Sequence, residues 1–257
     1  MDGSLPETFG EDKTFLKLSS LQRAVNGGFL LAPGFYEMTN RSYCLKAGTY
    51  GPSKGDGYMY APVKGPQDDV VIAILRNSLN HLEIPQSEVQ LLLWAIIARA
   101  KFENLSTKSK AVAALLLTPK QIAMLNRNAL EFISETALKS GAVDMPPALQ
   151  KVLEAENKLR SMFAEGIGTF EEFERIAVLA GMAPIDNSGV KRGMWSRHPD
   201  GYFIRYLPSG YSTTTVQLWV EDGSPAVGKE YDPSIHIACP ANTGAQRLAQ
   251  SGIEKKI

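Results

Sequence analysis

The sequence predicts an α+β protein with a helix-rich middle, packed with irregular strands and loops, followed by a β-rich C-terminal part. Two changes of pattern lead to this prediction. Apolar residues recur at helical spacing from about residue 68 to residue 181, and after Pro184 the alternation changes to a period of two. Before residue 68, short apolar and aromatic pieces stand among glycines and prolines, which is typical of strands and loops.

The N-terminal segment is expected to contain little regular structure. Residues 1–12 are polar and without periodicity, so a loose terminus is expected there. A short amphipathic helix with a glycine stop at Gly27 is expected next. The apolar residues at helical spacing that suggest it are Phe15, Leu18, Leu21 and Val25. Residues 29–66 are then expected to form strands and loops.

The middle of the chain is expected to hold five helices, because acidic or capping residues precede each apolar pattern. The helices are expected to start near Asp68, Ser87, Thr118, Pro146 and Thr169, the third running to about Lys139 and the last ending at Gly181. In the second helix, Ser87 and Gln90 fit a capping box. The residues that follow are apolar almost all round, which indicates a buried helix.

The C-terminal part is expected to begin with a hairpin. Residues 202–207 alternate with a period of two, residues 213–220 are β-branched and aromatic, and Pro208 and Gly210 mark the turn between them. A coil that holds Cys239 is expected to follow. With a linker near 186–192, the predicted domains are residues 1–185, which include a helical subdomain of about 68–181, and a small β-rich domain of residues 186–257.

Composition excludes several classes of function. In 257 residues, 27 basic side chains balance 27 acidic ones, so no net field attracts nucleic acid. The longest apolar runs, 91–98 and 111–117, are shorter than the roughly 20 residues that cross a bilayer, so no transmembrane segment is expected. The three histidines stand far apart and no Cys-x-x-Cys pair occurs, so neither a metal site nor a cofactor is expected. The first residues lack the pattern of a secretory signal.

The two cysteines leave several possibilities open. Cys44 and Cys239 could pair in an oxidising compartment or remain buried thiols. Cys44 could also act as a nucleophile with His236 or His198 as base and Asp232 as orienting residue.

A tyrosine-rich stretch surrounds Cys44. Its tyrosines are Tyr43, Tyr50, Tyr58 and Tyr60, and lysines are interleaved with them. Long irregular segments in compact domains often bind ligands, although these rings could equally pack the loop onto the helices.

Gln90 lies in an apolar helix, where a buried carboxamide must find hydrogen-bond partners. The order Tyr43-Cys44, a Gly/Pro loop with Tyr58, and then Gln90 with Trp94 four residues later resembles the thioester domains of bacterial surface adhesins. The resemblance covers about residues 35–98.

In that family, a cysteine and a glutamine form an internal thioester. The resemblance implies that Cys44 supplies the thiol, Gln90 the carboxamide and Trp94 a packing residue, with Tyr43, Tyr50 and Tyr58 near the ligand. It further implies a secreted or cell-surface adhesion module that covalently captures a protein or another amine-bearing ligand. Such a module reacts once, so it is not an enzyme. The alternatives are a non-covalent structural or envelope-binding protein, with a Cys44–Cys239 disulfide or free thiols, and a cysteine-dependent hydrolase or acyltransferase.

Overall fold

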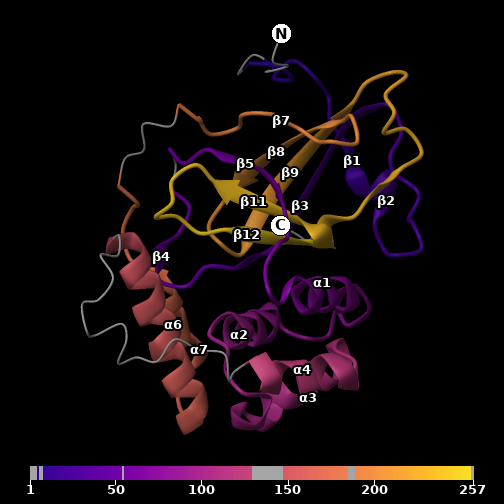
Figure 1. The fold of residues 1–257 in the computed structure, drawn as a ribbon. Helices are drawn as coiled ribbons and strands as arrows, with labels where there is room; N and C mark the ends of the chain where they lie inside the picture. Colours follow the sequence, from indigo (N-terminus) through magenta and orange to yellow (C-terminus); the bar gives the residue numbers. More distant parts are fainter. Residues whose placement is uncertain (1–4, 6–7, 54, 129–146, 185–188, 256–257) are drawn as a thin grey trace.

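The computed structural model describes residues 5, 8–53, 55–128, 147–184 and 189–255. The fold is mixed α+β: a large, nearly closed sheet occupies one end of the molecule, and the helices gather at the other end (Figure 1). The six described helices are α1 (Asp68–Asn77), α2 (Gln86–Ile97), α3 (Thr107–Leu116), α4 (Pro119–Asn128), α6 (Pro147–Glu165) and α7 (Phe170–Ala177).

The main sheet joins strands from both ends of the chain. In spatial order its strands are β5 (Tyr58–Pro62), β11 (His236–Pro240), β12 (Leu248–Glu254), β3 (Gly34–Cys44), β9 (Thr213–Val220), β8 (Phe203–Pro208) and β7 (Ser196–Arg197). All these neighbours are antiparallel, and β1 (Leu16–Lys17) adds to β3 in parallel. The N–H of Tyr60 in β5 donates to Ser196 Oγ in β7 at 3.0 Å, so the two edges approach each other.

Two small sheets complete the architecture. One pairs β2 (Phe29–Leu30) with β10 (Glu230–Tyr231), and the other pairs β4 (Thr49–Tyr50) in parallel with β6 (Val178–Leu179). The second ties the segment after Cys44 to the end of α7.

The predicted α+β class is confirmed, whereas the predicted order of its parts is not. The longest strand, β3, lies before the helices and pairs with β9 and β12 from the C-terminal part. The main sheet therefore includes strands from both sides of the boundary predicted near residue 186. Part of the expected linker, residues 186–188, lies outside the described ranges. The expected end of the third helix, near Lys139, lies outside them as well.

Several local predictions are confirmed. α1 starts at Asp68, and Thr169 and Glu172 form a capping box at α7. The strands β8 and β9 form the predicted hairpin.

Three local predictions are wrong. Residues 15–25 contain β1 and a 3-10 turn at Leu18–Ser20 in place of a helix, and Val25 is fully exposed while Leu18 is buried. The box of Ser87 and Gln90 is absent because Pro85 is the N-cap residue of α2 and Gln90 bonds elsewhere. The expected C-terminal coil contains β11 and β12.

Two groups of buried side chains form the core. One lies inside the sheet and is rich in tyrosine, including Tyr58, Tyr202 and Tyr231. The other fills the space between the sheet and the helices, and it includes Cys44 and Trp94. Cys44 therefore lies where the last residue of β3 meets α2.

Candidate functional site

Gln90 binds the backbone of Cys44. The N–H of Cys44 donates to Gln90 Oε1 at 2.8 Å, and Gln90 Nε2 donates to the carbonyl oxygen of Cys44 at 3.0 Å. Both residues are buried. These two bonds explain why a carboxamide is stable in the apolar helix α2, since its donor and its acceptor are both satisfied. They also fix the end of β3 against the helix.

The thiol of Cys44 faces a different glutamine. Sγ donates to Gln246 Oε1, and it also lies 3.5 Å from the carbonyl oxygen of Lys46. The other end of the Gln246 carboxamide is held as well, because Nε2 donates to the carbonyl oxygens of Thr49 at 2.9 Å and Ala177 at 3.0 Å. Cys44 and Gln246 have no exposed surface.

The backbone that carries Gln246 is positioned by pairing on both sides. Two residues further on, Leu248 begins β12 and lies opposite Cys44 in β3. On the other side, the N–H of Gln246 donates to the carbonyl oxygen of Tyr50 at 3.0 Å, and the N–H of Tyr50 donates to that of Gly244 at 2.9 Å. The sheet thus places the carboxamide beside the thiol.

Sequence reasoning missed Gln246 because its segment was expected to be coil. A signal was present: Gln246 lies between Ala245 and the apolar pair Leu248-Ala249, and the argument applied to Gln90, that a buried carboxamide needs partners, applies here too.

Burial controls the acidity of the thiol. Desolvation raises the pKa of Cys44 to about 11, and hydrogen bonding from the Trp94 side chain and the Lys46 backbone lowers it only in part. The indole N–H of Trp94 is buried. In the described structure it has no hydrogen-bond partner other than this thiol. A buried donor of this kind is available to stabilise negative charge that develops at the site.

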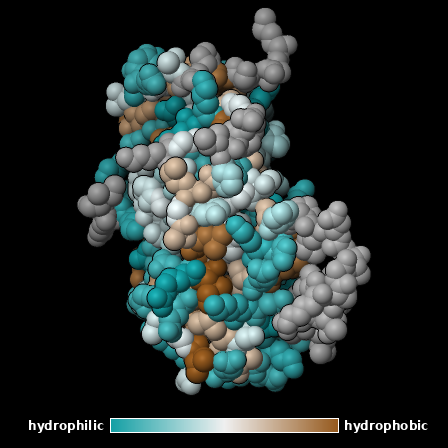
Figure 2. All heavy atoms as spheres, turned by 90° about the vertical axis from the view of Figure 1, so that its left-hand side faces the viewer, coloured by the Kyte–Doolittle hydropathy of each residue, from teal (hydrophilic) through white to brown (hydrophobic). Residues whose placement is uncertain are grey.

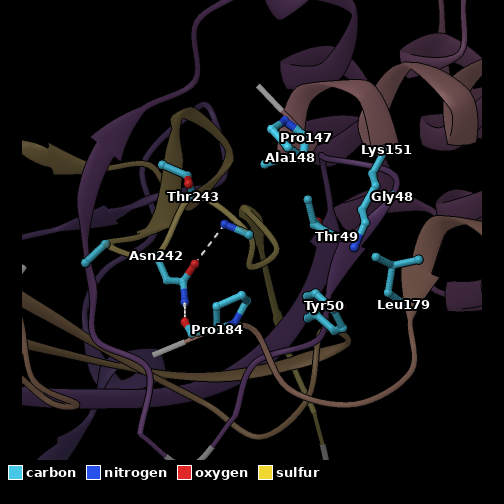
Figure 3. A pocket seen from close by; sticks show the side chains of 12 residues that line it. Gly48, Thr49, Tyr50, Pro147, Ala148, Lys151, Leu179, Pro184, Asn242 and Thr243 are labelled. Carbon is cyan, nitrogen blue, oxygen red and sulfur yellow. Dashed lines mark hydrogen bonds between the residues drawn. The ribbon is translucent and has the colours of Figure 1, made fainter. Parts of the chain in front are cut away.

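A pocket of about 450 Å³ lies next to the buried pair. Thr49, whose carbonyl holds Gln246, lines it together with Gly244, Tyr50, Asn242 and Lys151. In Figure 3, Lys151 extends from α6 toward Thr49, and Asn242 is held by bonds to Pro184 and Gly244.

The face shown in Figure 2, which is the left-hand side of Figure 1, is mixed in character. Hydrophobic side chains gather there in a narrow strip among hydrophilic ones.

The predicted binding residues have different locations. Tyr43 and Tyr58 are buried in the core, whereas Tyr50 lines the pocket and Trp94 packs near the thiol, stacked on Phe170 at 5.6 Å between ring centroids. Of the three tyrosines expected to contact a ligand, only Tyr50 reaches the pocket.

Two of the three histidines, His198 and His236, form a buried cluster of their own. The Nε2 atoms of His198 and His236 are 3.0 Å apart, and His236 Nδ1 lies 2.5 Å from the backbone carbonyl oxygen of Asp232. The carboxylate of Asp232 accepts from Arg76 and Ser234 instead. Neither histidine contacts the Cys44 thiol in the described structure, so the geometry does not assemble the nucleophile and base of a cysteine hydrolase.

The cysteines are both free. Cys239 Sγ lies 3.9 Å from the carbonyl oxygen of Pro240, its neighbour in β11. Within the described ranges, no group of three or more His, Cys, Asp or Glu residues could hold a metal ion. Of the helices that the structure describes, none has the length and apolarity needed to span a bilayer.

Comparison with models of protein families, with curated proteins and with solved structures finds no match for this chain.

Proposed function

We propose that Cys44 and Gln246 form an internal thioester, and that the protein is a secreted or cell-surface adhesion module that captures amine-bearing ligands covalently. The observation that supports this proposal most strongly is the contact between the Cys44 thiol and the Gln246 carboxamide inside a fully buried site. The resemblance of the Tyr43-Cys44 motif and Trp94 to thioester domains adds support from the sequence.

Thioester formation needs no other reactant. The sulfur of Cys44 attacks the carboxamide carbon of Gln246, the carbon–nitrogen bond breaks, and ammonia leaves with the proton of the thiol. Trp94 can donate to the oxygen on which charge develops. Burial excludes water, which would otherwise hydrolyse the product.

Capture of a ligand follows by aminolysis. A neutral amine of the ligand attacks the same carbon, the carbon–sulfur bond breaks, and the Cys44 thiol recovers a proton. The product is a stable amide between Gln246 and the ligand. The reaction occurs once per molecule, so the protein is a covalent binder and not an enzyme.

This proposal gives Gln90 a different role from the one that the resemblance implied. Both ends of the Gln90 carboxamide are engaged with the backbone of Cys44, whereas Gln246 reaches the sulfur. We therefore infer that Gln90 is a positioning residue, which holds the end of β3 so that Sγ faces Gln246.

The intact mass of the purified protein tests the proposal. The wild-type chain is expected to be lighter than its sequence by one ammonia, and methylamine is expected to add to it. Cys44→Ala and Gln246→Ala should both have full mass and should not react. A wild-type chain of full mass with an alkylatable Cys44 would contradict the proposal and favour a non-covalent binding protein with free thiols. A loss of two hydrogens would instead indicate a Cys44–Cys239 disulfide.

A further inference from the structure

One wall of the pocket is the loop that follows β11, and hydrogen bonds hold this loop in place from several sides. Asn242 Oδ1 accepts the N–H of Gly244 at 2.8 Å, and Asn242 Nδ2 donates to the carbonyl oxygen of Pro184. From outside the pocket, Lys46 Nζ donates to the carbonyl oxygen of Thr243 at 2.6 Å. The wall is therefore fixed by the protein itself, so binding of a ligand would not have to order it.

Another wall is the first part of α6, which packs closely against the segment that leads into β4. This approach requires a glycine at position 48. A Cβ on Gly48 would lie 2.5 Å from the carbonyl oxygen of Lys151 and 2.8 Å from the Cβ of Ala155, and the φ of Gly48 is +70°. The close packing places the Lys151 side chain above the ring of Tyr50, with Nζ 5.8 Å from the ring centroid.

The pocket is positively charged, although the chain as a whole carries no net charge. None of the described residues that line it is acidic. The Lys151 ammonium contacts the Tyr50 ring but makes neither a hydrogen bond nor an ion pair with another described residue. Burial, and after it the positive charge of Arg247, lower the pKa of the neighbouring Lys46, whereas Cys239 raises it. An anion in the pocket would stabilise these positive charges.

The rest of the lining suits a ring that carries hydroxyl groups. Tyr50 and Leu179, both partly buried, supply apolar surface. The carboxamide of Asn242 keeps one N–H and one oxygen lone pair beyond the two bonds that hold it, and the exposed Thr243 adds a hydroxyl group. Figure 3 shows Lys151 and Tyr50 on one side of the pocket and Asn242 and Thr243 on the other. A volume of about 450 Å³ is sufficient for one sugar ring.

We propose that this pocket binds an acidic saccharide non-covalently, with the carboxylate of a uronic acid on Lys151 and one face of the sugar ring on Tyr50. The charge-assisted hydrogen bond to the ammonium group selects the carboxylate, and the C–H groups of the sugar pack on the aromatic face. The hydroxyl groups of the sugar bond to Asn242 and Thr243. Neither Cys44 nor Gln246 lines the pocket, so this site does not depend on the proposed thioester.

Small probes without an amine test the class of ligand. Wild-type protein is titrated with the methyl glycoside of glucuronic acid, with that of glucose, or with acetate, and binding is followed by ligand-observed NMR. The glucuronic acid probe is expected to bind with a millimolar Kd, and the other two at least about fivefold more weakly. Equal affinity for the glucose probe would overturn the role of the carboxylate, and equal affinity for acetate would overturn the role of the sugar ring. The absence of binding by the glucuronic acid probe would overturn the site.

Removing one charge tests the recognition of the carboxylate. Lys151→Met keeps an unbranched side chain but lacks the ammonium group, so it is expected to bind the glucuronic acid probe about fivefold more weakly and the glucose probe as wild type does. Lys158→Met, at an exposed position of α6 that does not line the pocket, is the matched control. The same affinity of both variants for the glucuronic acid probe would overturn the assignment of Lys151.

A change of the aromatic ring tests the stacking. Tyr50→Leu keeps an apolar side chain and the backbone bonds of β4, but it should weaken the binding of both sugar probes several-fold, because the flat face is lost. Tyr50→Phe retains the face and should bind both probes as wild type does. Wild-type affinity in Tyr50→Leu would overturn the stacking of the sugar on Tyr50.

Discussion

The carboxamide of Gln246 lies against the thiol of Cys44, although 202 positions of the sequence separate the two residues. They meet because Leu248, two residues after Gln246, lies opposite Cys44 across the β12–β3 pairing. A second glutamine, Gln90, holds the backbone of Cys44 from the helical side. In the proposed mechanism Gln90 positions Cys44 and Gln246 reacts with it, so the two roles are expected to respond differently to mutation.

Gln90→Ala is expected to lower the free energy of unfolding by about 2–5 kcal/mol, because it leaves the buried N–H and carbonyl of Cys44 without partners. Chemical denaturation measures this change. The folded fraction should still lose ammonia, more slowly than wild type. Gln86→Ala is the control on the same helix: Gln86 donates to the carbonyl oxygens of Ser42 and Ser212, so its loss should leave the position of Cys44 unchanged. A Gln90→Ala protein that loses ammonia as fast as Gln86→Ala would contradict the positioning role.

Trp94→Phe is expected to slow thioester formation about 100-fold, the usual effect of removing one donor from developing negative charge. The variant keeps an aromatic ring in contact with Phe170 but lacks the indole N–H. The rate is measured by first reopening the thioester with concentrated ammonia, then removing the ammonia and following the loss of mass. Trp219→Phe is the control, because Trp219 lies in β9 and is stacked on Phe203 instead of on a residue of the site. The same rate in Trp94→Phe and wild type would rule out a role for the N–H.

Thioester formation is expected to accelerate with pH. The pKa of Cys44 is raised to about 11 by burial, so between pH 7 and pH 10 the thiolate fraction, and with it the rate, should rise about tenfold per unit. The same reopening and closing assay measures this slope. A rate that is independent of pH in this range would show that the thiolate is not the attacking species.

The protein is expected to lose stability in mild acid because of His236. Burial lowers the pKa of this residue to about 4, with His198 acting in the same direction and Asp232 and Asp200 opposing it. The unfolded chain binds the proton near pH 6.5, so the stabilisation is present above that pH and is lost as the pH falls toward 4. The loss should amount to roughly 3 kcal/mol.

Thermal or chemical unfolding between pH 7 and pH 4 measures the slope of the free energy of unfolding against pH. His236→Phe should flatten it, whereas His81→Gln, at a side chain that is not fully buried, should leave it unchanged. If the His236→Phe protein loses stability with falling pH as steeply as wild type, a group other than His236 causes the loss.

The sequence predicted the local parts of the site better than the long-range ones. The segments around Cys44 and Gln90 were expected to meet because of the resemblance to thioester domains, and the Gln90 carboxamide does bond to the backbone of Cys44. The resemblance assigned Gln90 as the partner of the thiol, whereas the sulfur of Cys44 contacts Gln246. Gln246 reaches Cys44 only through strand pairing between the two ends of the chain, and no periodicity encodes that register. The expected helix at residues 15–25 failed for a related reason: pairing of Leu16 and Lys17 with β3 overrides a weak helical pattern.

The site of amine attachment tests the central claim most directly. Wild-type protein is treated with methylamine and digested, and the modified peptide is sequenced by mass spectrometry. We predict that the methylamide lies on Gln246 and that Cys44 becomes alkylatable at the same time. A methylamide on Gln90 would contradict the assignment of Gln246, and the absence of any methylamide from protein that is short of one ammonia would contradict the thioester itself.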